Sequence, residues 1–138
     1  MRFIDANVFL YAFLKPKREL SQADINIKRS ARKIIRLIDT EEKVLTTTAH
    51  ISEVLNILEA HTNYDYAREA AERLILNDNI NIEAVSKEDY AIAIEIAKKH
   101  GISMNDGLAI LFMDRNGLKE IYSFDKHFDK VEVISRVT

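Results

Sequence analysis

The feature that most constrains the fold is the alternation, along the whole chain, of short apolar or β-branched segments with longer amphipathic ones. This pattern predicts strands over residues 2–4, 43–47, 80–85, 120–124 and 131–134. It predicts helices over residues 7–14, 21–39, 64–76, 86–100 and 103–116, and a further helix from Thr48 onward. Strands that alternate with helices form parallel sheets covered on both faces. We therefore predict an α/β fold: a three-layer α/β/α sandwich around a central, mainly parallel sheet of four to five strands.

Local signals support several of these boundaries. The hydroxyl of Thr48 suits the N-cap of the helix that follows it, and Gly101 suits the C-terminal end of the helix before it. In residues 21–39, apolar side chains fall on one side of the helix and a basic stripe on the other. The stripe consists of Arg29, Arg32, Lys33 and Arg36.

Composition limits the classes of protein to which the chain can belong. A chain of 138 residues, 47% hydrophobic and 30% charged, is typical of one globular domain, here residues 1–138. The absence of cysteine excludes disulfides and cysteine-ligated zinc. Only four residues precede Asp5, too few for a signal peptide, and no segment has the roughly 20 apolar residues of a membrane span. We therefore expect a cytoplasmic protein without a membrane partner, and its net charge of −2 gives no overall attraction to nucleic acid.

Four acidic residues are candidates for a functional site. Asp5 follows the first predicted strand and Asp125 follows the strand that ends at Phe124, so both should lie at the carboxyl edge of the sheet, where α/β proteins bind ligands. Asp106, in the first turn of a helix, and Glu53, inside the helix after the second strand, could approach the same edge. Converging carboxylates repel one another unless they are protonated or bridged by cations. Oxygen ligands suit Mg²⁺ or Mn²⁺, and such a site can hydrolyse phosphate esters.

Each of these acids also has a purely structural interpretation. Asp5 could cap a helix, and Asp125 could begin a turn. Asp106 stands three residues after Ser103, as in a capping box. Glu53 points away from the centre of the apolar stripe of its helix, and this spacing favours a solvated side chain.

Two residues close to Asp125 have similar alternatives. His127 lies between two aspartates and could ligate a metal, although single histidines in charged loops are usually solvated. Asp129 is near enough in sequence to assist Asp125, or it could be a surface residue.

The acids lie in four segments: residues 3–9 (FIDANVF), 46–55 (TTTAHISEVL), 103–110 (SMNDGLAI) and 122–129 (YSFDKHFD). In this order the segments resemble the motifs of the PIN-domain ribonuclease family, and the resemblance spans nearly the whole chain. Gly107 departs from the family pattern, in which a larger residue usually follows the third acid.

The resemblance implies a set of roles. Asp5, Glu53, Asp106 and Asp125 would be catalytic and would hold one or two divalent cations, Mg²⁺ or Mn²⁺. Asn7 and Ser123 would orient ligands or bound water. The implied reaction is in-line attack of metal-activated water on an RNA phosphodiester. The basic stripe of the helix over residues 21–39 would contact RNA phosphates, or it would be only a solvated surface.

Because the chain is small and carries no added domain, it most resembles the toxins of VapBC toxin–antitoxin pairs. That resemblance implies an RNA substrate, a VapB-type antitoxin and a homodimer. The lack of cysteine argues against PIN proteins that carry a zinc ribbon. An RNA-processing PIN nuclease outside a toxin–antitoxin pair and a non-catalytic PIN-like scaffold remain alternatives. A haloacid-dehalogenase-like phosphatase is disfavoured, because its general acid would stand where this chain has Asn7.

Overall fold

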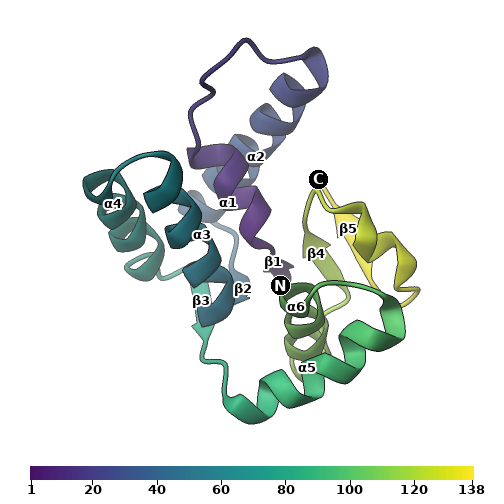
Figure 1. Cartoon of the computed structure of the whole chain (residues 1–138). Helices are drawn as coiled ribbons and strands as arrows, with labels where there is room; N and C mark the ends of the chain where they lie inside the picture. The colour runs from purple at the N-terminus through teal and green to yellow at the C-terminus, as the bar shows by residue number, and fades with distance from the viewer.

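The computed structural model describes all residues, 1–138, and is built around a five-stranded parallel sheet. The strand order is β3-β2-β1-β4-β5, so β1 lies at the centre (Figure 1). The strands are β1 (Arg2–Ile4), β2 (Val44–Thr47), β3 (Ile80–Glu83), β4 (Glu120–Tyr122) and β5 (Ser135–Val137).

Helices cover both faces of this sheet. They are α1 (Ala6–Phe13), α2 (Gln22–Thr40), α3 (Thr48–His61), α4 (Tyr64–Ile75), α5 (Lys87–His100), α6 (Met104–Arg115) and the short 3₁₀ helix η1 (Lys126–Lys130). Helices α1 to α4 pack on one face, whereas α5, α6 and η1 pack on the other. The predicted three-layer α/β/α architecture with a parallel sheet is therefore confirmed.

The central strands show why the sheet has two apolar faces. In β1, Ile4 belongs to the core beneath α1–α4, while its neighbour Phe3 belongs to the core beneath α5 and α6. In β4, Tyr122 and Ile121 divide between the two cores in the same way. Successive side chains of a strand point to opposite faces, so each of these two strands supplies apolar side chains to both cores.

Two local predictions need correction. The N-cap of α3 is Thr47, whose hydroxyl accepts a hydrogen bond from the His50 N–H, and not Thr48. The hydroxyl of Thr48 instead accepts from the Val85 N–H at 3.1 Å and so ties α3 to the segment after β3. Both threonines can cap by chemistry alone, and tertiary contacts decide between them.

The predicted last strand, residues 131–134, is also wrong. Those residues form a turn from which Val131 and Ile134 enter the core beneath α5 and α6. The actual edge strand, β5, begins at Ser135 and pairs with β4. No helix of the structure is both long enough and apolar enough to cross a membrane.

Candidate active site

Asp5 stands at the carboxyl end of β1, and both of its carboxylate oxygens accept hydrogen bonds. Oδ1 accepts from the Ala6 N–H at 2.8 Å and so caps α1. Oδ2 accepts from the Ser123 hydroxyl, also at 2.8 Å, and the Ser123 oxygen accepts from the backbone N–H of Asp125 at 3.0 Å. One serine, fully buried after β4, therefore links the first and last candidate acids.

The surroundings of Asp5 favour its protonated form in the metal-free protein. Burial, together with the nearby carboxylates of Asp106 and Glu53, raises the pKa of Asp5 to about 7, against the opposing hydrogen bonds from Ser123 and Ala6. Repulsion of this kind requires the three carboxylates to be close together. The structure thus brings Glu53 and Asp106 to the edge where Asp5 lies.

Asp106 differs from a capping aspartate elsewhere in the chain. Helix α5 begins with a complete capping box, in which Asp89 accepts from the Ser86 N–H at 2.9 Å and also pairs with Arg115 at 2.7 Å. Helix α6 begins with the same spacing, and the Ser103 hydroxyl accepts from the Asp106 N–H at 3.1 Å. The carboxylate of Asp106, however, does not complete a capping box, and its buried Oδ2 has no hydrogen-bond partner.

The free carboxylate of Asp106 fits a divalent cation. Burial, together with the carboxylates of Asp125 and Glu53, raises its pKa to about 6, against the opposing effects of Ser103 and His127. A buried acceptor without a partner costs about 1–3 kcal/mol. A cation at this place would satisfy the oxygen and cancel the repulsion between the carboxylates.

Glu53 is half-buried on α3, with a definite partner from another helix. Its Oε1 accepts from the side-chain amide of Asn105 at 2.7 Å. Asn105 immediately precedes Asp106, so one turn of α6 presents both a carboxylate and a group that orients Glu53. Sequence reasoning missed Asn105, and the available signal was its position in the same first helical turn as a candidate acid.

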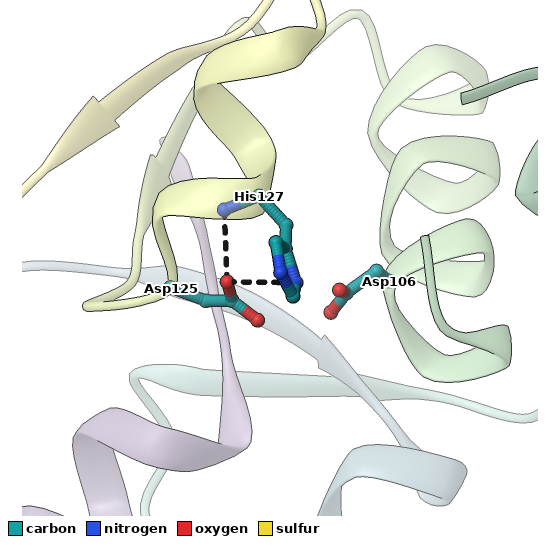
Figure 2. Close-up of side chains that lie close together, drawn as sticks. All are labelled: Asp106, Asp125 and His127. Atoms are coloured by element: carbon teal, nitrogen blue, oxygen red, sulfur yellow. Dashed lines mark hydrogen bonds and ion pairs between the residues drawn. The ribbon is translucent and has the colours of Figure 1, made fainter. Parts of the chain in front are cut away.

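Asp125 caps η1 and lies against His127. Its Oδ1 accepts from the His127 N–H at 2.8 Å, and the ring nitrogen Nδ1 of His127 lies 3.1 Å from the same oxygen. Figure 2 shows this pair facing the carboxylate of Asp106 across a short gap.

The other residues predicted from the sequence fall around this centre or outside it. Asn7 lies next to Ser123, with its amide 3.4 Å from the hydroxyl and its Oδ1 accepting from the Phe124 N–H at 3.3 Å. Asp129 points elsewhere, because both of its oxygens pair with Arg136 at 3.0 and 3.2 Å. The basic stripe of Arg29, Arg32, Lys33 and Arg36 lies on the exposed face of α2, and no hydrogen bond or ion pair joins it to the carboxylates.

Comparison with known families decides the identity of this arrangement. The PIN domain family matches residues 2–134, nearly the whole chain. The chain belongs to the PIN domain family. No curated protein sequence matches this PIN domain significantly.

Solved structures support the PIN fold. The sarcin–ricin-loop-cleaving toxin VapC20 of Mycobacterium tuberculosis gives a TM-score of 0.74, with 18% identity over 94% of this chain and 93% of that one. A chain of the VapBC2 complex of Rickettsia felis, bound to DNA of its promoter, gives 0.67, with 12% identity over 99% and 96%. A chain of a toxin–antitoxin complex from Klebsiella pneumoniae gives 0.66, with 12% identity over 100% and 97%. At these identities the likeness is one of fold.

Proposed function

We propose that this PIN domain is an endoribonuclease that hydrolyses RNA phosphodiester bonds with Mg²⁺ or Mn²⁺ as cofactor. The observation that carries the proposal is the buried, unpartnered oxygen of Asp106, which faces other carboxylates at the carboxyl edge of the sheet. Asp5, Glu53, Asp106 and Asp125 are the proposed catalytic residues and cation ligands. Four acids at this edge provide the charge and the oxygen donors that two-metal phosphodiester hydrolysis uses.

The chain's own residues have separable tasks in this proposal. A bound divalent cation supplies Lewis acidity, which lowers the pKa of water and neutralises phosphate charge. Ser123 holds Asp5 in one orientation through its hydroxyl, and Asn105 holds Glu53 through its amide. Groups that hydrogen-bond to a metal ligand fix its orientation and adjust its basicity without binding the metal themselves.

Cleavage of a labelled single-stranded RNA in Mg²⁺ or Mn²⁺ tests the proposal. Asp5→Asn and Asp106→Asn should each lower the rate by at least about 100-fold, because even groups that only orient a ligand cost about 10–100-fold when lost. The matched control is Asp114→Asn, an exposed aspartate on the same helix as Asp106, which should cleave at the parent rate. Cleavage that persists in both site variants, or in EDTA, would contradict the proposal.

We further propose that the protein acts in the cytoplasm as the toxin of a VapBC-type pair, neutralised by a VapB-type antitoxin. Its support is the shared fold, over more than nine-tenths of each chain, with VapC20 and with chains of two toxin–antitoxin complexes. Expression of the chain alone should stop growth, and co-expression of a short neighbouring reading frame should restore it. Growth that continues while RNA is cleaved would favour an RNA-processing nuclease outside such a pair.

A homodimer completes the proposed assembly. Tyr90 and Ile94 lie four residues apart on α5, so they share one face of that helix, and they are 41% and 42% exposed. Neighbouring exposed apolar side chains are a feature of protein interfaces. Sedimentation should give a dimer for the parent and a monomer for Ile94→Lys, and a parent that remains monomeric at high concentration would exclude this assembly.

A further inference from the structure

His127 lies in the same cluster as two of the proposed cation ligands, although the proposed catalytic set consists of acids alone. One ligand atom from each of Asp106, Asp125 and His127 lies within 4.8 Å of the other two. Figure 2 shows the three side chains converging, one from α6 and two from the segment that contains η1. Ligands about 2.0–2.3 Å from one ion lie within about 4.5 Å of each other, so a small closure would let one ion bind all three.

The distance within the histidine–aspartate pair fits shared ligation. Nδ1 of His127 and Oδ1 of Asp125 are 3.1 Å apart. Two adjacent ligands of an octahedral ion, each about 2.1 Å from it, are separated by about 3 Å. The spacing of this pair therefore fits two adjacent ligands of one ion.

The backbone holds the imidazole at this place. The His127 N–H donates to Asp125 at 2.8 Å, and the next residue, Phe128, is completely buried and anchors η1 to the core. The His127 side chain itself is 57% exposed, which leaves room for water to complete the coordination of an ion.

Asp106 provides an independent indication of a ligand. It is only 5% exposed, and its unpartnered Oδ2 belongs to the carboxylate that faces His127 and Asp125 in Figure 2. An ordinary surface ion pair between His127 and Asp125 would leave this buried oxygen unsatisfied. An ion bound by all three residues satisfies it.

We propose that His127 is a nitrogen ligand of the cation held by Asp106 and Asp125, and that it makes this site prefer a transition-metal ion such as Mn²⁺ to Mg²⁺. The inference rests on the divalent-cation site of the proposed function. Imidazole nitrogen is a common ligand of transition-metal ions, whereas Mg²⁺ is held mainly by oxygen. One nitrogen among oxygen ligands therefore shifts selectivity without abolishing Mg²⁺ binding.

Pulsed electron paramagnetic resonance of the Mn²⁺-loaded protein tests the ligation directly, because a coordinated ¹⁴N nucleus modulates the electron spin echo. The parent should show one nitrogen coupling, and His127→Gln should lose it while still binding Mn²⁺. By calorimetry, His127→Gln should weaken Mn²⁺ binding about tenfold and Mg²⁺ binding at most about threefold. The matched control is His61→Gln, an exposed histidine on α3 outside the cluster, which should keep the coupling and both affinities.

The outcomes separate this inference from the proposed function. A parent without nitrogen coupling, or a coupling that survives in His127→Gln, would overturn the ligation. RNA cleavage by a parent that lacks the coupling would leave the nuclease proposal intact and remove only this inference. A parent that shows the coupling but cleaves no RNA would retain the ligation and remove the nuclease proposal. His127→Asn repeats the test with a shorter side chain, and thermal unfolding verifies that each variant is folded.

Discussion

Asp106 makes the metal-free protein less stable at neutral pH than it would be with a neutral side chain. Its pKa is raised from 3.8 to about 6 in the folded state, so the stabilisation from the bound proton is complete below about pH 4 and is lost as pH rises through 6. We predict that Asp106→Asn raises the melting temperature at pH 8 in EDTA by a few degrees, and changes it little at pH 4.

Asp89→Asn is the matched control for that measurement. Asp89 has the same spacing from its N-cap serine, but its hydrogen bonds with Arg115 and Ser86 lower its pKa. Its stabilisation is present at neutral pH and is lost as pH falls, so Asp89→Asn should lower the melting temperature at pH 8. A loss of similar size in Asp106→Asn would mean that Asp106 has a stabilising partner and needs no cation.

Ser123 sets how readily Asp5 loses its proton. Burial is the main cause that raises the pKa of Asp5 to about 7, and the hydrogen bond from Ser123 already opposes that rise. Ser123→Ala should therefore raise that pKa further. Since cation ligands bind deprotonated, Mn²⁺ affinity at pH 7 should fall about tenfold and recover in part at pH 8. Calorimetry at several pH values measures this, with Ser52→Ala, an exposed serine on α3, as control. A pH dependence identical to that of the parent would contradict the role.

At the scale of the helices, Gly107 allows α5 and α6 to pack closely beneath Asp106. A Cβ added at Gly107 would lie 2.8 Å from the carbonyl oxygen of Ala93 and 3.4 Å from the Cβ of Ala97. This contact explains why the chain departs from the larger residue that is usual in the family. We predict that Gly107→Ala destabilises the protein by about 1–3 kcal/mol, because the two helices must separate. Urea unfolding at equilibrium measures the change.

A double variant identifies which contact of the added Cβ causes the loss of stability. If the backbone carbonyl of Ala93 is the obstacle, adding Ala97→Gly to Gly107→Ala should recover little of the lost free energy. Full recovery would show that the two methyl groups, and not the backbone, limit the approach. Equal stability of Gly107→Ala and the parent would contradict the close packing itself.

Some elements of this fold are specified by the local sequence, whereas others depend on tertiary contacts. The central strands were predictable because burial on both faces favours short runs of apolar and β-branched residues. The last strand was not, because Val131 and Ile134 are buried from a turn while β5 lies at the edge of the sheet. The position of Asp5 at the end of a strand followed from topology, whereas β4 ends at Tyr122, before the predicted Phe124, and Asp125 lies three residues further on as the N-cap of η1. The sequence placed Asn105 beside a candidate acid but did not identify it as the partner of Glu53, because the two residues lie on helices that cover opposite faces of the sheet.

At the scale of the whole molecule, the candidate site joins the two helical layers. Asp5 and Glu53 belong to the side of the sheet that α1 to α4 cover, through α1 and α3. Asp106 and His127 belong to the opposite side, through α6 and η1. A cation bound between them would therefore crosslink two separate hydrophobic cores. Its effect should extend to the stability of the entire fold.

We predict that Mn²⁺ raises the melting temperature by an amount that grows as pH rises from 5 to 7.5. Protons compete with the cation for Asp106, with a pKa of about 6, and for Asp5, with a pKa of about 7, so the binding free energy available for stabilisation is small below these values. At a free Mn²⁺ concentration 100 times Kd, stabilisation should reach about 2.7 kcal/mol. Thermal unfolding with and without Mn²⁺ at each pH measures the gain, and Asp106→Asn should abolish most of it. A gain independent of pH, or one retained in that variant, would place the bound cation away from this edge of the sheet.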